Sequence, residues 1–254
     1  MLLSRFIVND AVRYGIVEED MISPIQGDPF GELVRTGEKL KLSEVILLSP
    51  CQPSKVVCVG LNYADHAEEL NLNLSKEPLL FLKPPSAVIG PGDFIICPNA
   101  CQQLDYEGEL AVVIREKAKN VSVEEVHKII LGYTCGNDIT ARDLQRLDGQ
   151  WTRAKSFDTF CPLGPWINNE LDPTKIDIKL WVNDELKQNS NTSQMIFPVD
   201  FLISYISRIM TLCPGDVVLT GTPFGVGSVK SGDRITVEIE GLGRLTNQVK
   251  TEGF

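Results

Sequence analysis

The feature that most constrains the fold of this chain is a turn that recurs three times, each time directly before a short apolar segment. Pro-Gly-Asp occupies positions 91–93 and 214–216, and Ser-Gly-Asp occupies positions 231–233. Glycine and aspartate are favoured in tight turns because they accept backbone conformations that most residues avoid. Each turn therefore predicts a strand directly after it. The predicted strands are Phe94–Cys97, Val217–Thr220 and Arg234–Ile239.

A β-hairpin is predicted further along the chain. Lys179–Val182 and Glu185–Gln188 are strand-like segments, and the two residues between them, Asn183-Asp184, suit a two-residue turn. Together with the strands that follow the three turns, this hairpin makes strands the dominant element. We expect a chain that is mainly β with some α structure.

Two helices are predicted from their boundary signals. Ser122–Glu125 has the pattern of a capping box, and Gly132 is placed to end a helix over Val123–Leu131. Pro198 precedes apolar residues at helical spacing, and this second helix is expected to end before Pro214.

The chain is predicted to divide near residue 52. Residues 1–50 indicate short strands broken by turns, and the prolines within Ser49–Pro53 disfavour helix and suggest a linker. A buried strand over Val56–Val59 follows. We therefore predict a small N-terminal domain, residues 1–52, and a larger domain, residues 53–254.

The composition argues against several classes of function. Lys and Arg number 24 against 34 Asp and Glu, a formal net charge of -10, whereas general binding to nucleic acids or acidic membranes needs a basic face. No run approaches the roughly 20 consecutive apolar residues of a membrane span, and no secretory signal is expected. The 7 cysteines include no C-x-x-C pair and no zinc-ligand spacing, which indicates reduced thiols in a cytoplasmic protein.

Acidic residues gather at the start of one apolar strand. Asp105, Glu107 and Glu109 alternate along the chain, so their side chains share one face of that strand. Such a face is either solvated or neutralised by a cation, and carboxylate oxygens suit Mg²⁺, Mn²⁺ or Ca²⁺. Asp138 follows another apolar segment, where it is either a further ligand or the N-cap of a helix over Ala141–Leu147.

The chain has 2 histidines, and one of them has a carboxylate nearby in the sequence. On a helix, His66 and Glu69 lie one turn apart on the same face. A carboxylate raises the basicity of imidazole, which suits a general base, although such a pair is also a common surface ion pair. His127 lies in a charged segment and is expected to be solvated.

Two loops complete the candidate residues. Trp151–Asp158 is predicted to be a loop or a strand edge, and its Lys155 either holds an enolate or carboxylate oxygen or is simply solvated. Leu219–Gly227 is glycine-rich, and its backbone N–H groups and the Thr222 hydroxyl suit a bound carboxylate. This loop matches neither a P-loop nor a dinucleotide-binding fingerprint.

Seven segments, in this order, resemble the fumarylacetoacetate hydrolase family from about Pro53 to Thr246. They are VVCVGLNYADHAEEL, PLLFLKPPSAVIG, LDYEGELAVVI, GYTCGNDITARDLQ, WTRAKSFDTFCPLGPW, PVDFLISYIS and PGDVVLTGTPFGVG. The resemblance implies the family's mainly β fold, with a β-roll or sandwich core that follows the small N-terminal domain. It also implies a homodimer.

The resemblance implies a metal site. Glu107, Glu109 and Asp138 match the three carboxylates that bind one Mg²⁺ or Mn²⁺ in this family. Asp105 has no counterpart among these ligands, so it returns to the interpretation of a strand-edge residue.

The resemblance also implies catalytic and binding roles. His66 and Glu69 match the family's general-base dyad. Gln145 and Lys155 match groups that position the oxo or enolate oxygens of the substrate. Thr222 matches a contact to the substrate's carboxylate.

The implied substrate is a small anionic 2-oxo acid. The main prediction is hydrolysis of a C–C bond in an acylpyruvate-like 2,4-dioxo acid through a metal-bound enolate. The alternative is decarboxylation or isomerisation of oxaloacetate-like or 2-hydroxyhepta-2,4-diene-1,7-dioate-like acids, and a second alternative is a metal- and oxo-acid-binding protein without turnover. Asn71–Pro78 is predicted to be a lid over His66.

Overall fold

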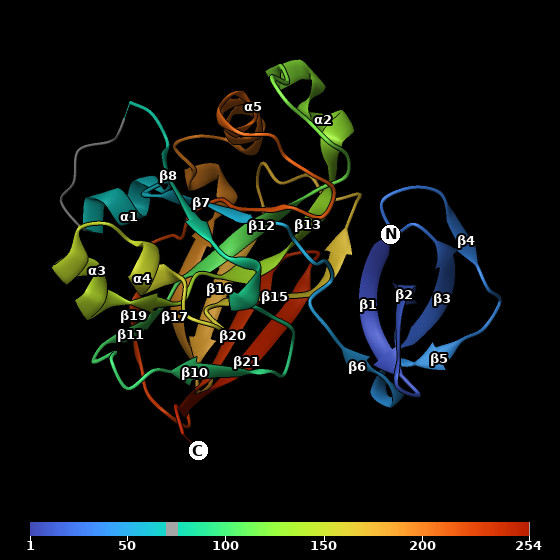
Figure 1. Ribbon diagram of the computed structural model, residues 1–254, viewed down its shortest axis with the longest axis horizontal. Coiled ribbons are helices and arrows are strands. Elements are labelled where there is room, and N and C mark those ends of the chain that lie inside the picture. Colours follow the sequence, from blue (N-terminus) through green and yellow to red (C-terminus); the bar gives the residue numbers. More distant parts are fainter. Residues whose placement is uncertain (70–75, 254) are drawn as a thin grey trace.

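The computed structural model describes residues 1–69 and 76–253 (Figure 1). Residues 71–75 of the predicted lid lie outside this description. The prediction of a mainly β chain is confirmed, with strands β1 to β21 and five short α-helices among the described residues. No helix in these residues is long and apolar enough to cross a membrane.

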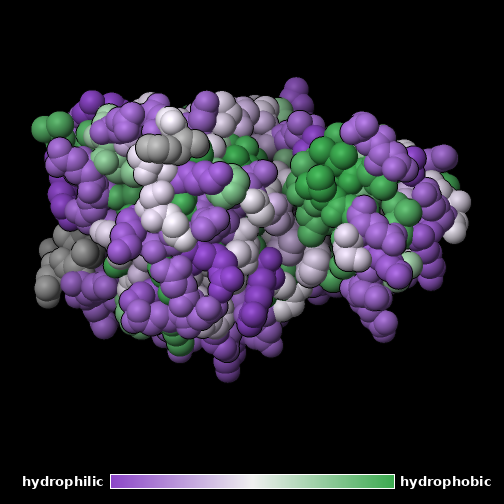
Figure 2. All heavy atoms as spheres, turned by 90° about the horizontal axis from the view of Figure 1, so that it is seen from below, coloured by the Kyte–Doolittle hydropathy of each residue, from purple (hydrophilic) through white to green (hydrophobic). Residues whose placement is uncertain are grey.

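The N-terminal part is a small antiparallel sheet. Its strands are β1 (Leu2–Val8), β2 (Ala11–Glu18), β3 (Met21–Gly27), β4 (Leu33–Arg35), β5 (Leu40–Lys41) and β6 (Ile46–Leu47), with a 3-10 helix at Leu42–Glu44. Figure 2 shows an apolar patch on this part. The exposed apolar residues of the N-terminal part include Val12, Val34 and Ile46. Leu2 of β1 pairs with Asn168 of the larger part, so the main sheet continues through both parts.

The larger part contains the remaining elements. Its strands are β7 (Val56–Gly60), β8 (Leu79–Lys83), β9 (Val88–Ile89), β10 (Phe94–Cys97), β11 (Leu104–Tyr106), β12 (Gly108–Ile114), β13 (Ile130–Asn137), β14 (Thr140–Ala141), β15 (Cys161–Asn168), β16 (Asp177–Val182), β17 (Glu185–Asn191), β18 (Val217–Leu219), β19 (Gly227–Val229), β20 (Arg234–Ile239) and β21 (Gly243–Thr251). Its helices are α1 (Ala64–Glu69), α2 (Val126–Ile129), α3 (Arg142–Asp148), α4 (Thr152–Lys155) and α5 (Val199–Ile209), with 3-10 helices at Pro85–Ala87, Val123–Glu125 and Thr192–Gln194.

Two sheets of the larger part enclose the main hydrophobic core. The main sheet runs in the order β1-β15-β13-β12-β18-β7-β8, and a five-stranded sheet has the order β10-β21-β20-β16-β17. Val112 of the first sheet, Leu180 of the second and Ile206 of α5 are fully buried in one apolar cluster. A separate three-stranded sheet, β14-β11-β19, adjoins the site described below.

The recurring turns begin strands as predicted. Gly92, Gly215 and Gly232 have φ angles of +81°, +82° and +93°, a region that side chains with a Cβ atom rarely adopt. β10, β18 and β20 follow these turns. The predicted hairpin is also confirmed, since β16 pairs with β17 and both turn residues, Asn183 and Asp184, have positive φ.

One predicted helix is shorter than expected, and the other is confirmed. The segment after Ser122 forms a 3-10 turn and then α2, which ends at Ile129, and the Ser122 side chain does not cap it. Gly132 lies inside β13, where a Cβ atom would stand 2.4 Å from the Asn168 carbonyl oxygen. This glycine therefore serves the close approach of β15 rather than a helix end. The helix predicted after Pro198 is α5.

Candidate active site

A cavity of about 180 Å³ lies beside β7, β12 and helices α1, α3 and α4. Every residue predicted for the site lines this cavity except Glu69, which lies on α1 with His66. Leu61, Phe81 and Trp151 add apolar surface to its wall. The cavity thus combines charged and apolar groups.

Three carboxylates meet in this cavity because two paired strands carry them. Glu107 lies at the break between β11 and β12, Glu109 lies on β12, and Asp138 directly follows β13. β12 and β13 are antiparallel, and the Asp138 N–H donates to the Glu107 carbonyl oxygen at 2.8 Å. All three side chains are buried, and one oxygen of each lies within 4.8 Å of the others. Asp138 is not an N-cap, because α3 is preceded by Ala141.

Three cationic side chains offset part of this charge. Lys155 Nζ lies 2.9 Å from Glu107 Oε2 and 2.6 Å from Asp138 Oδ2. Lys83 donates to the other oxygen of Asp138, and Arg142 donates to the other oxygen of Glu107. Burial raises the pKa of Glu107, but Lys155 and Arg142 outweigh burial and hold this pKa at about 2.

Glu109 differs from the other two carboxylates. It accepts a hydrogen bond from the Gly221 N–H at 2.6 Å, and in the described chain it forms no ion pair with a lysine or arginine. Burial, Asp138 and Glu107 raise its pKa well above its usual range. A buried carboxyl without a cationic partner, beside two further carboxylates, fits a hard divalent cation such as Mg²⁺ or Mn²⁺.

The predicted histidine pair is formed. His66 Nδ1 lies 2.9 Å from Glu69 Oε2, one turn apart on α1. This contact leaves Nε2 as the ring nitrogen available to a substrate. His127 is exposed on α2, as predicted.

The glycine-rich loop, residues 220–226, connects the carboxylates to this pair. Its Gly221 N–H binds Glu109, and its Thr222 hydroxyl donates to the Gly108 carbonyl oxygen at 2.9 Å. Further along, the Gly225 N–H donates to Glu69 Oε1 at 3.2 Å.

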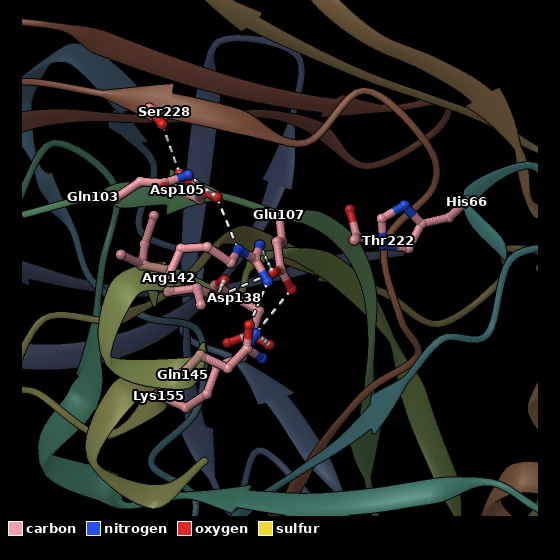
Figure 3. Close-up of polar contacts among 12 residues, drawn as sticks. His66, Gln103, Asp105, Glu107, Asp138, Arg142, Gln145, Lys155, Thr222 and Ser228 are labelled. Atoms are coloured by element: carbon pink, nitrogen blue, oxygen red, sulfur yellow. Dashed lines mark hydrogen bonds and ion pairs between the residues drawn. The ribbon is translucent and has the colours of Figure 1, made fainter. Parts of the chain in front are cut away.

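Figure 3 shows side chains on two sides of the carboxylate cluster. His66 and Thr222 lie on one side of Glu107, and Gln145 and Lys155 lie on the other. Gln145 Oε1 accepts a hydrogen bond from Arg142 at 2.6 Å, which fixes its amide beside the cluster. Both sides line the same cavity.

The interpretation of Asp105 as a solvated strand-edge residue is wrong. Its side chain is buried and accepts hydrogen bonds from Arg142 Nε at 2.8 Å and Ser228 Oγ at 2.9 Å. Asp105 thereby holds Arg142 against Glu107, since the same guanidinium contacts both carboxylates.

The prediction of a loop around Lys155 is also wrong. Residues 152–155 form the short helix α4, and the Lys155 side chain is 2% exposed. The two carboxylates that it contacts outweigh the cost of burial and raise its pKa. Lys155 is therefore a buried cation and not a solvated loop lysine.

Sequence reasoning missed three residues of this site. Lys83 and Arg142 lie within segments that carry the family resemblance, but neither was assigned a role. A lysine that ends the apolar segment LLFLK was the only local signal for Lys83. Gln188, which binds Gly108 and Thr222, has no recognisable signal in the sequence.

Comparison with known proteins places this chain in a family. The model for the fumarylacetoacetate hydrolase C-terminal domain matches residues 55–250, and a model described as Rv2993c-like, N-terminal, matches residues 1–50. The chain therefore belongs to the fumarylacetoacetate hydrolase family. Members of this family bind a divalent metal, in agreement with the carboxylate cluster.

Several relatives are named for an activity. The structure of 2-hydroxyhepta-2,4-diene-1,7-dioate isomerase from Mycobacterium marinum is 44% identical, with a TM-score of 0.94 and coverage of 100% of both chains. Oxaloacetate tautomerase Fahd2a, mitochondrial, from Rattus norvegicus is 45% identical over 82% of this chain and 70% of its own length. Maleylpyruvate hydrolase from Sphingobium sp. SYK-6, solved with manganese and pyruvate, is 32% identical, with a TM-score of 0.83 and coverage of 99% of both chains.

Proposed function

We propose that this protein is a divalent-metal-dependent tautomerase or isomerase of a small 2-oxo acid of the oxaloacetate type. The relatives named above as isomerase and tautomerase are more similar to this chain than the maleylpyruvate hydrolase. Hydrolysis, the main prediction from the sequence, therefore gives way to the alternative.

The observation that carries this proposal is the placement of an acid–base pair and a buried ammonium on opposite sides of one carboxylate cluster. His66, paired with Glu69, lies on one side, and Lys155 lies on the other. Tautomerisation needs a base to move a proton at carbon 3 and a cation to stabilise negative charge on the 2-oxygen. This arrangement supplies both.

Each residue has a defined task in the proposed reaction. A divalent cation held by the three carboxylates would polarise the 2-oxo group of the acid. Lys155 has three N–H donors and uses two on Glu107 and Asp138; among the described residues the third has no hydrogen-bond acceptor, so it can serve the 2-oxygen. His66 Nε2 would take the proton from carbon 3, and Glu69 would stabilise the imidazolium that forms.

The test follows the ketonisation of enol-oxaloacetate by its ultraviolet absorbance, with Mg²⁺ and with EDTA. We expect acceleration only with the metal, and a loss of roughly 10²–10⁴-fold in His66→Gln because a general base is removed. Lys128→Gln is a matched control, since Lys128 is exposed on α2 and pairs with Glu125 away from the cavity.

The same preparation is then given acetylpyruvate, with the products followed by NMR. Acetate and pyruvate without any acceleration of ketonisation would overturn the proposal in favour of C–C hydrolysis. Mg²⁺-dependent binding of oxalate without turnover of either compound would indicate a binding protein. The homodimer implied by the resemblance stays a prediction, which sedimentation velocity would test.

A further inference from the structure

Gln188 connects the two sides of the proposed substrate site. It lies on β17 and its side chain is fully buried. Oε1 accepts a hydrogen bond from the Gly108 N–H at 2.9 Å. Nε2 donates to Thr222 Oγ1 at 2.9 Å and to the carbonyl oxygens of Pro223 and Phe224 at 2.9 Å and 3.3 Å.

Only one orientation of this amide satisfies its surroundings. Oε1 faces an N–H group, whereas Nε2 faces one hydroxyl and two carbonyl oxygens. A flipped amide would place its oxygen against the carbonyls of Pro223 and Phe224 and its NH₂ against the Gly108 N–H. The network therefore holds Gln188 in a single state.

The partners of Gln188 belong to the site itself. Gly108 lies between Glu107 and Glu109, and the Thr222 hydroxyl donates to the Gly108 carbonyl oxygen. The loop packs directly on β17, because a Cβ atom at Gly225 would stand 2.3 Å from the Lys187 carbonyl oxygen. Movement of the Gln188 amide would thus be transmitted to the loop.

This network determines which group of Thr222 is free for a ligand. The hydroxyl hydrogen is used on Gly108, and the hydroxyl oxygen already accepts from Gln188. The Thr222 backbone N–H has no acceptor among the described residues, and Thr222 lines the cavity. A free backbone N–H is a strong donor to a carboxylate.

We propose that Gln188 is a positioning residue that holds the Thr222 N–H toward the carboxylate of the substrate. The inference rests on the proposed function, since it takes the ligand to be a 2-oxo acid. Gln188 does not touch the ligand, and it acts through the glycine-rich loop.

The first test compares Gln188→Met with Gln248→Met. Gln188→Met keeps the length of the side chain but loses all its hydrogen bonds, while Gln248 is exposed on β21 and, within the described residues, its side chain bonds only the Gly232 carbonyl. We expect KM for oxaloacetate and the Kd of oxalate in Mg²⁺ to rise about tenfold in Gln188→Met, as for a loss of about 1.4 kcal/mol. kcat and both constants in Gln248→Met should stay unchanged.

Gln188→Glu separates positioning from a merely structural role. A protonated carboxyl can accept from Gly108 and donate one hydrogen bond to Thr222, although it has no second hydrogen for the Pro223 and Phe224 carbonyls, whereas the ionised form can only accept. KM relative to the native protein should therefore be lowest at low pH and rise with pH. If Gln188→Met does not fold, this variant decides the question.

Two results would overturn the inference. They are an oxalate Kd in folded Gln188→Met equal to that of the native protein, and a KM ratio in Gln188→Glu that does not change with pH. Oxalate binding requires no turnover, so it is read even if the protein does not act on oxaloacetate. Failure of the proposed function and failure of this inference are thereby distinguished.

Discussion

Two buried carboxylates of this chain have opposite surroundings. Asp216, in the second Gly-Asp turn, is fully buried and accepts hydrogen bonds from Ser54, Lys55 and Cys213. Glu109 is almost as deeply buried, but it accepts one hydrogen bond from a backbone N–H and has two carboxylates beside it.

The difference separates a structural carboxylate from one suited to a ligand. Hydrogen bonds from Ser54, directly after the linker, and from Cys213, at the turn, replace the water that Asp216 loses on burial. Asp216 therefore ties the end of the linker to β18. Glu109 lacks such compensation, and the cost of its burial appears as a raised pKa. A carboxyl of the second kind is where a cation binds with the greatest gain.

Glu109→Gln should give the largest effect. The loss of one ligand should lower Mg²⁺-dependent kcat/KM by roughly 10³-fold, because several kcal/mol of charge stabilisation depend on the metal. The melting temperature in EDTA should be unchanged, since the amide has the same shape as the carboxyl and, like its protonated form, carries no charge. Enzyme assays and thermal melts check both, and a marked loss of stability with retained activity would make Glu109 a structural residue like Asp216.

Asp216→Asn should show the reverse behaviour. The variant leaves Lys55 without its charged partner and places an NH₂ group among N–H donors, so the free energy of unfolding should fall by about 3 kcal/mol. kcat/KM of the folded fraction should stay within about twofold of the native value, because the residue does not line the cavity. Urea unfolding and assays in the absence of urea measure the two quantities.

Metal binding should depend on pH through Glu109. Burial and the two neighbouring carboxylates raise the pKa of Glu109, which favours its protonated form in the metal-free protein, whereas Mg²⁺ binds the ionised form. The apparent affinity should therefore rise with pH, by about tenfold per pH unit below this pKa, with release of about one proton. Calorimetry in buffers of different ionisation enthalpy measures the release, and an affinity that does not fall as the pH is lowered would contradict this account.

Asp233→Asn should have the smallest effect. Asp233 belongs to the third Gly-Asp turn and accepts hydrogen bonds from the Lys230 N–H at 2.8 Å and Asn183 Nδ2 at 2.7 Å. Without a charged partner to lose, the variant should be destabilised by about 1 kcal/mol. A loss as large as that of Asp216→Asn would show that the turn, and not the contact with the linker, sets the stability.

Local patterns along the chain determined much of the fold. The Gly-Asp turns, the hairpin turn at Asn183-Asp184 and helix α5 were predicted because their physical causes lie within a few residues. Gly132 shows the limit of this reasoning. Its neighbours suit a helix end, but its conformation depends on Asn168, which β15 brings against it.

The sequence by itself identified the carboxylates, the histidine pair and Lys155 as candidate site residues, since these lie in segments that resemble a family as well as in chemically suggestive patterns. The tertiary structure decided which groups surround them. Gln188 is 80 residues from Gly108, and Lys83 is 55 residues from Asp138. Spacing along a chain predicts contacts within one helix or strand. Contacts between distant segments depend on how strands pair within a sheet and how the sheets pack, which placed Lys83 beside Asp138 and Gln188 beside Gly108.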